Sequence, residues 1–188
     1  MKLKTMFFSM AMATAILSAS ECSYTAKGAS VGWEAYKTPK KVGVKGTFDA
    51  IAFEAEGAES VVKLLEGAKV RINTKRVNSG NEGRDKTLAE SFFALMASET
   101  IEGSVKTVNS DKNEMIVSLS MNGVERDVPM TYSEEGENLR ADGYIDMFDF
   151  ALDKAHASIN EACYDLHSGK TWSDVKVSVE IKVEKECR

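Results

Sequence analysis

The sequence lacks the motifs that mark many enzymes and metal proteins. It contains no Gly-x-Ser-x-Gly nucleophile elbow, no Cys-His signature and no phosphate-binding P-loop. Its two histidines, His156 and His167, match no common metal-ligand spacing, although a metal site formed by both with Cys163 is an alternative. We therefore predict a protein that is not an enzyme and that needs no metal or cofactor.

A surplus of positive charge and a second long apolar run are also missing. The chain has 24 lysines and arginines against 29 acidic residues, a formal net charge of −5. Nucleic acid and anionic membrane surfaces are therefore not expected partners. Beyond Leu17, no apolar stretch approaches the roughly 20 residues that a membrane-spanning helix requires, so we expect no membrane span.

The N-terminus has the pattern of a secretory signal peptide. Two lysines precede an uncharged run, Thr5–Leu17, and small residues follow it up to Ser20. The run is short for a membrane span, and the small residues suit a cleavage site. We predict a signal segment over 1–20 and, because no linker or repeat divides the rest, one domain over 21–188.

Three cysteines follow the predicted signal segment, so one must remain without a disulfide partner. If the first and last strands pair antiparallel, the start of one lies opposite the end of the other, which brings Cys22 near Cys187. The two pairings that involve Cys163 stay open. Acylation of Cys22 in a lipoprotein is a further alternative, although Glu21 stands where the processing enzyme prefers a small residue.

Alternation of apolar and polar residues predicts antiparallel strands. The clearest run is 172–184, where Val or Ile occupies every second position from Val175 to Val183. Asn122-Gly123 stands between two such runs and predicts a two-residue hairpin turn. The other predicted strands lie near 29–38, 41–53 and 67–75 and in a four-stranded meander over 99–145. The total is about eight strands, enough for a sheet to close around one small ligand.

Three stretches have helical rather than strand periodicity, namely 59–66, 86–96 and 146–164. They predict an all-β barrel with a few helical crossovers. An outer-membrane barrel also alternates with a period of two, but the helices and the modest aromatic content of 8% argue against that class.

Several segments together carry a family resemblance. They are Val31-Gly32-Trp33, Val42–Phe48, Val70–Thr74, Asn81–Leu88 with Phe92-Phe93 and Met96, Val128-Pro129-Met130, and Ala141–Phe150. These segments resemble the YceI-like family, and the match extends from Ala29 to Val183. The resemblance implies a lipocalin-like, eight-stranded antiparallel barrel, commonly periplasmic, that holds a polyisoprenoid or similar amphiphile. The chain departs from the family at Glu34–Lys37, where a histidine is frequent, and in Phe150–Lys170.

Two groups of side chains are candidates for ligand contact. Adaptable aromatic and thioether groups suit a flexible apolar chain, and those expected to line a cavity are Phe48, Phe53, Phe92, Phe93, Met96, Met121, Met130, Phe148 and Phe150. Arg84 and Asp85 follow a Gly-rich loop and are expected to receive a polar head group. The plainer interpretations are a filled core for the first group, and a helix cap with a local ion pair for the second.

The leading hypothesis is a periplasmic carrier for a long-chain apolar lipid, either a polyisoprenoid or an isoprenoid quinone precursor. One alternative is a lipid-free protein-interaction module with a solid core, which small residues expected inside the barrel, Gly43, Gly46 and Gly103, argue against. A less favoured alternative is a lipid-modifying enzyme. A homodimer through an exposed sheet edge or helix face stays open.

Overall fold

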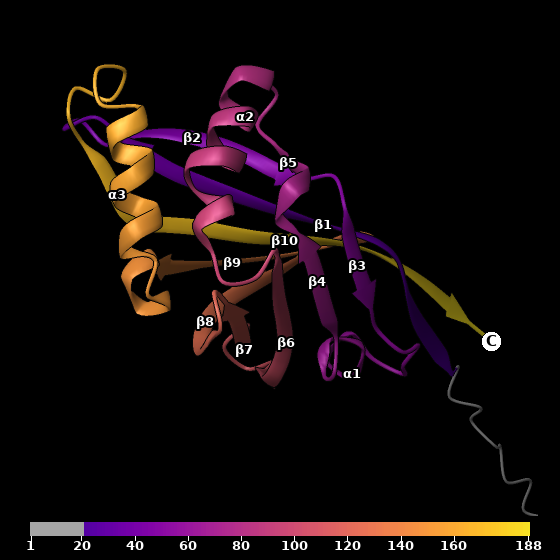
Figure 1. The fold of residues 1–188 in the computed structure, drawn as a ribbon. Coiled ribbons are helices and arrows are strands. Elements are labelled where there is room, and N and C mark those ends of the chain that lie inside the picture. The colour runs from indigo at the N-terminus through magenta and orange to yellow at the C-terminus, as the bar shows by residue number, and fades with distance from the viewer. Residues whose placement is uncertain (1–20) are drawn as a thin grey trace, which may run out of the picture.

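The structure is a computed structural model that describes residues 21–188, so the predicted signal segment, 1–20, lies outside the described residues. Long strands form one curled sheet, and two of the helices cover one end of it (Figure 1). No helix within 21–188 has the length and apolar character needed to cross a membrane.

The elements follow one another in a strand-rich order. The strands are β1 (Cys22–Lys37), β2 (Val42–Phe48), β3 (Ile51–Glu54), β4 (Lys69–Asn73), β5 (Val77–Asn78), β6 (Thr100–Asn109), β7 (Glu114–Met121), β8 (Val124–Glu135), β9 (Asn138–Asp146) and β10 (Thr171–Cys187). The helices are α1 (Val61–Leu65), α2 (Glu82–Ser91) and α3 (Asp153–Ala162), with short 3-10 turns η1 (Thr74–Arg76), η2 (Phe93–Leu95) and η3 (Met147–Phe150).

The sheet has ten strands in the order β3-β4-β6-β7-β8-β9-β10-β1-β2-β5, and every pair is antiparallel. This arrangement confirms the predicted all-β barrel-like fold, whereas the count of eight is too low. The strand predicted over 41–53 is interrupted at Asp49 and Ala50, which separates β2 from β3, and the two-residue β5 was not foreseen. Because β3 and β5 do not pair with each other, the curled sheet is a half-barrel.

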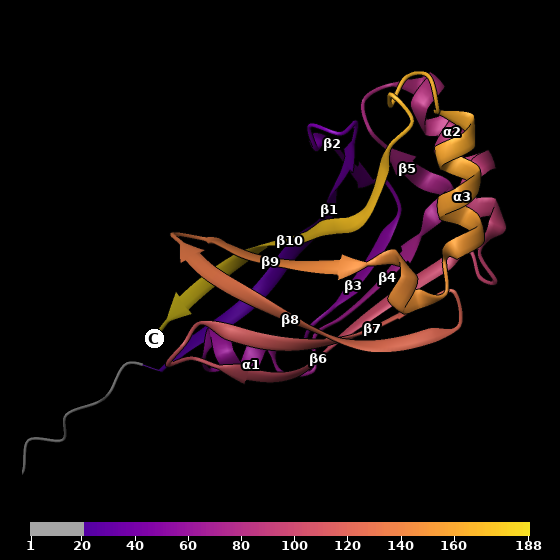
Figure 2. The ribbon, with the colours of Figure 1, turned by 90° about the vertical axis from the view of Figure 1, so that its left-hand side faces the viewer.

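The two longest strands, β1 and β10, connect opposite ends of the molecule. They pair from Cys22 opposite Cys187 to Lys37 opposite Thr171. A disulfide joins Cys22 to Cys187, so the pair of cysteines that antiparallel strands were expected to bring together is covalently linked. Figure 2 shows this end far from α2 and α3.

The predicted hairpin at Asn122-Gly123 is confirmed. Met121 pairs with Val124, and both turn residues have positive φ, 54° for Asn122 and 77° for Gly123. That conformation matches the twist of the flanking strands. The Asn122 side chain also donates to the Phe150 carbonyl at 2.9 Å, so the turn fastens η3 to the sheet.

The helices differ in detail from the sequence prediction. The segment predicted over 86–96 begins earlier, at Glu82, because the side chain of Asn81 accepts a hydrogen bond from the Arg84 N–H at 2.9 Å and caps α2. The segment predicted over 146–164 divides into η3 and α3, since Ala151 adopts the left-handed conformation with φ 52°. This break turns α3 to lie beside α2 (Figure 1).

Helix α1 fills one end of the barrel interior. Helix α1 contacts β1 and β6 and inserts Leu64 and Leu65, which are 2% and 1% exposed, into the core. An isolated bridge between Tyr24 and Ala58 closes the neighbouring gap beside β1. We call this region, near the disulfide, the filled half.

Candidate functional site

The other half of the barrel contains a cavity of about 640 Å³, in the range of small-molecule sites. We call this region the hollow half. Its walls come from β1, β2, β4, β6, β7, β8, β9 and β10 and from the facing sides of α2 and α3. Inward residues of the strands, such as Val117, Leu119 and Val177, make the lining mainly apolar. A cavity of this size is not the solid core that the interaction-module alternative requires.

Five of the nine predicted apolar contacts line this cavity. They are Phe48, Phe92, Phe93, Met121 and Met130. Phe93 packs edge-on against both Phe48 and Phe92, with ring centroids 5.9 and 5.1 Å apart. These rings connect β2 to the segment after α2, so they form one side of the wall. Their contact with a ligand stays a prediction.

The other four predicted apolar contacts lie outside the cavity lining. Phe150 is 1% exposed and belongs to the packed core, and Phe53 packs against that core from the edge strand β3. Met96 also packs against the core, whereas Phe148 is 47% exposed and lies edge-on to His156. The sequence pattern predicts which apolar residues are buried. It does not predict whether a buried residue borders the cavity or belongs to the packed core.

Arg84 lines the cavity, whereas Asp85 does not. Arg84 donates from Nε to the Ser79 hydroxyl at 2.8 Å and from Nη2 to the Ser79 carbonyl at 2.7 Å. Asp85 in turn accepts hydrogen bonds from the Ser79 N–H, at 2.8 Å, and from the Ser79 hydroxyl. Asn81 rather than Asp85 caps the helix, and Arg84 is held by a serine rather than by an ion pair. Asp85 thus positions the loop that positions Arg84.

Sequence reasoning missed several residues of the cavity. Trp33 lies opposite Gly46 on β2, and a Cβ at Gly46 would collide with the indole and lie 2.8 Å from the Asn78 carbonyl oxygen. Of the glycines expected inside the barrel, Gly103 does line the cavity, whereas a Cβ at Gly43 would meet Glu34, so Gly43 does not point inward. A large aromatic residue paired across strands with glycine is a signal that could have identified this wall.

The cavity also has titratable side chains near the end of β1, where β1 meets the α3–β10 loop. They are Lys37, Cys163 and His167. The His167 Nδ1 atom lies 2.8 Å from the Thr171 hydroxyl. Burial lowers the pKa of His167, and the positive charge of Lys37 lowers it further. Burial also raises the pKa of the Cys163 thiol, against a smaller opposing effect of Lys37. Lys37 therefore acts on the pKa of both groups.

The described part of the chain holds no cluster of three or more His, Cys, Asp or Glu that could bind a metal ion. The metal alternative placed His156, His167 and Cys163 together. His156 instead approaches the Thr171 carbonyl, with Nε2 at 3.1 Å from the oxygen, and His167 approaches the hydroxyl of the same threonine.

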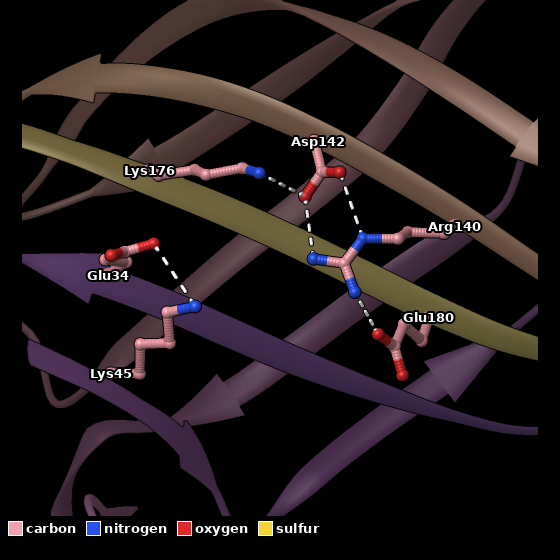
Figure 3. A network of polar contacts seen from close by, with 6 residues as sticks. All are labelled: Glu34, Lys45, Arg140, Asp142, Lys176 and Glu180. Carbon is pink, nitrogen blue, oxygen red and sulfur yellow. Dashed lines mark hydrogen bonds and ion pairs between the residues drawn. The ribbon is translucent and has the colours of Figure 1, made fainter. Parts of the chain in front are cut away.

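A group of ion pairs links neighbouring strands outside the cavity, and Figure 3 shows it from close by. Arg140 bonds Asp142 on its own strand and Glu180 on β10, and Lys176 lies 3.3 Å from Asp142. The guanidinium of Arg140, with Lys176, holds the pKa of Asp142 below its ordinary value, although burial opposes this shift. Because these charges satisfy one another on β9 and β10, the network stabilises the sheet and takes no part in the cavity.

The sequence profile of the YceI-like domain matches residues 24–186. The chain belongs to the YceI-like family. This match covers nearly the whole described region and agrees with the resemblance seen in the sequence. None of the curated proteins matches the chain in sequence.

Solved structures share the fold of this YceI-like chain at low sequence identity. BcnA of Burkholderia cenocepacia superposes with a TM-score of 0.56 and 15% identity, over 83% of this chain and 96% of BcnA. A polyisoprenoid binding domain from Saccharophagus degradans, implicated in plant cell wall breakdown, gives 0.55 and 16%, over 88% of this chain and 99% of that domain. The YceI protein of Campylobacter jejuni gives 0.55 and 18%, over 77% and 85%.

Proposed function

We propose that this YceI-like protein is a periplasmic carrier that holds a long-chain lipid, a polyisoprenoid or an isoprenoid quinone precursor, in the hollow half of its barrel. The observation that carries the proposal is the cavity of about 640 Å³ with its mainly apolar lining. The Saccharophagus degradans domain, described as polyisoprenoid binding, has the same fold, which supports this class of ligand.

Apolar burial supplies enough free energy for such a complex. Each buried CH₂ group contributes about 0.8 kcal/mol, so a chain of roughly 20 carbons contributes about 16 kcal/mol before ordering costs are subtracted. Phe and Met side chains in the wall adapt to a flexible chain, as at Phe92, Met121 and Met130. Few polar groups are needed to hold the chain itself, so the cavity accepts a class of lipids rather than a single compound.

Two features support export. The sequence pattern of residues 1–20 is that of a signal peptide, and the Cys22–Cys187 disulfide is typical of an oxidising compartment such as the periplasm. A carrier in that compartment would shield a lipid from water between two membranes.

The proposal is tested by native mass spectrometry of the protein purified from a bacterial periplasm. We expect a stoichiometric long-chain lipid, which organic extraction then releases for identification, and the same spectrum gives the oligomeric state. A protein that arrives without lipid and also takes up no added polyprenol or ubiquinone would contradict the proposal.

A cavity-blocking variant locates the lipid. Ala35 lines the cavity between Val44 and Val175 of the neighbouring strands, so Ala35→Trp places an indole in the space that the lipid needs. Ser30 lies on the same strand and is exposed, so Ser30→Trp is the matched control. We expect Ala35→Trp to lose lipid and Ser30→Trp to retain it, with unchanged far-UV circular dichroism in both. Equal lipid content in the two variants would place the lipid elsewhere.

A further inference from the structure

The charged residues of the cavity lining are all basic. Lys37 and Arg84 line the cavity, and no Asp or Glu is among the lining residues that the described chain supplies. The cavity therefore presents two cations and no carboxylate to a ligand.

Lys37 occupies the end of β1, where its strand meets β10 at Thr171. It is half-buried, and within residues 21–188 no carboxylate lies within ion-pair distance of its ammonium group, whereas Lys41 on the same turn pairs with Asp174 at 2.7 Å. Burial is the larger cause of the lowered pKa of His167, and the charge of Lys37 lowers it further. A cation beside low-dielectric walls attracts an anion more strongly than one in water.

Arg84 is presented from the α2 side of the same cavity. Its Nε and Nη2 atoms are fixed by Ser79, and the third nitrogen, Nη1, has no hydrogen-bond acceptor in the described part of the protein. No carboxylate there forms an ion pair with it either, because the nearby Asp85 is engaged by Ser79. The guanidinium is thus held in place with one donor edge still available, which suits recognition of a phosphate or carboxylate oxygen.

We propose that the cavity selects lipids with an anionic head group, a phosphate or a carboxylate, which Lys37 and Arg84 bind at the mouth while the chain lies in the apolar interior. This inference rests on the proposed lipid carriage and narrows it, since a quinone or a free polyprenol has no charge to offer these cations. The anion supplies the partner that the chain itself does not provide to either side chain.

The test compares lipids that differ only in the head group. Geranylgeranyl phosphate is measured against geranylgeraniol, and palmitate against hexadecanol, by displacement of a fluorescent fatty acid from the full-length exported protein. We expect the wild type to bind the phosphate lipid, or both anionic lipids, at least roughly tenfold more tightly than the neutral counterpart, as charge-assisted hydrogen bonds imply. Preference for phosphate alone, or for both anions, supports the proposal and identifies the head group.

Substitutions assign the preference to the two cations. Lys37→Gln and Arg84→Gln should each reduce the anionic preference several-fold and leave the affinity for geranylgeraniol unchanged, whereas Lys37→Arg should keep it. Lys45→Gln and Arg71→Gln remove exposed cations, 77% and 70% accessible, whose ion-pair partners are Glu34 and Glu102 on the outer face, and serve as controls.

Three outcomes would overturn the inference. The first is equal affinity of the wild type for charged and neutral lipids, a comparison that needs no variant to fold. The second is a preference that survives in the Lys37→Gln, Arg84→Gln double variant, and the third is an equal loss in the control variants. In each case the neutral lipids still bind, so lipid carriage stands. Failure of all four lipids to bind would instead contradict the proposed function itself.

Discussion

The two halves of the barrel use the same strands in different ways. Near the disulfide, α1 fills the interior with Leu64 and Leu65, and the neighbouring Leu139 is 2% exposed. Under α2 and α3, the same sheet surrounds a cavity of about 640 Å³. The filled half therefore contributes packing that stabilises the fold, and the hollow half provides the space for a ligand.

The contrast between the filled half and the hollow half indicates how this fold can contain a large cavity. Unfilled apolar space forfeits packing contacts and costs free energy, so the rest of the structure must compensate for it. Here the compensation is concentrated at the opposite end, in the α1 plug and the covalent link between β1 and β10. Helices α2 and α3 line the hollow half on the side that the strands leave open.

The largest expected effect comes from opening the disulfide. The Cys22→Ser, Cys187→Ser variant should lose roughly 3–5 kcal/mol of unfolding free energy, because the bond closes a loop with a sequence separation of 165 residues. Chemical denaturation measures this loss. Lipid uptake at 20 °C should be unchanged, since the cavity lies in the other half. If a variant that is still folded loses lipid uptake, the structure of the hollow half depends on the disulfide in the filled half.

Leucine truncations in the two halves should differ in cost. Leu65→Ala creates a new cavity in the filled half and should cost roughly 3 kcal/mol. Leu119→Ala enlarges a void that already exists and should cost about half as much in the lipid-free protein. Urea unfolding of both variants checks the contrast. Equal costs would mean that the hollow half is packed as tightly as the filled half.

The native Cys163 thiol can report whether the cavity holds a lipid, so no cysteine has to be introduced. It lines the cavity and is the free cysteine of the described chain. A bound lipid should slow its alkylation by N-ethylmaleimide at least roughly tenfold, because the chain covers the sulfur. Mass spectrometry of timed samples measures the rate. An unchanged rate in the loaded protein would place the lipid away from the wall that Cys163 forms.

The smallest effect concerns pH at the mouth. The pKa of His167 lies below its ordinary value of 6.5, chiefly because the ring is buried and secondly because of Lys37. The folded chain then binds fewer protons than the unfolded chain near that pH, so the contribution of His167 to stability is complete above about pH 6.5 and declines as the pH falls. NMR titration should give a His167 midpoint below 6.5, and Lys37→Gln should raise it. An unchanged midpoint in Lys37→Gln would show that the charge of Lys37 does not affect the pKa of His167.

Local patterns predicted those parts of the fold that depend on neighbouring residues. The Asn122-Gly123 turn and the alternation of β10 are properties of short segments, so both could be recognised without the rest of the chain. The break at Ala151 was not recognisable in this way. It places alanine in a left-handed conformation that alanine does not prefer, and hydrogen bonds from Asn122 to the carbonyls of Phe150 and Ala151 help to hold it there.

The candidate site was predicted only in part for the same reason. Apolar residues of strands were correctly expected inside, but Phe150 packs in a solid region and Met130 borders the cavity, although both are buried. Lys37 was not foreseen as part of the lining, because a lysine at the end of a strand is ordinarily solvated. In the fold, Lys37 lies opposite Thr171 and lines the cavity together with His167 of the α3–β10 loop.

The sequence by itself determined the antiparallel strands, the main turn and the family, because these follow from periodicity and from short motifs. The tertiary structure alone decided how far α1 fills the barrel, which side chains border the remaining space, and that Lys37 and Arg84 line the same cavity with no carboxylate in its lining. Those features depend on contacts between residues far apart in the chain, and local pattern carries no information about the volume that such contacts leave open.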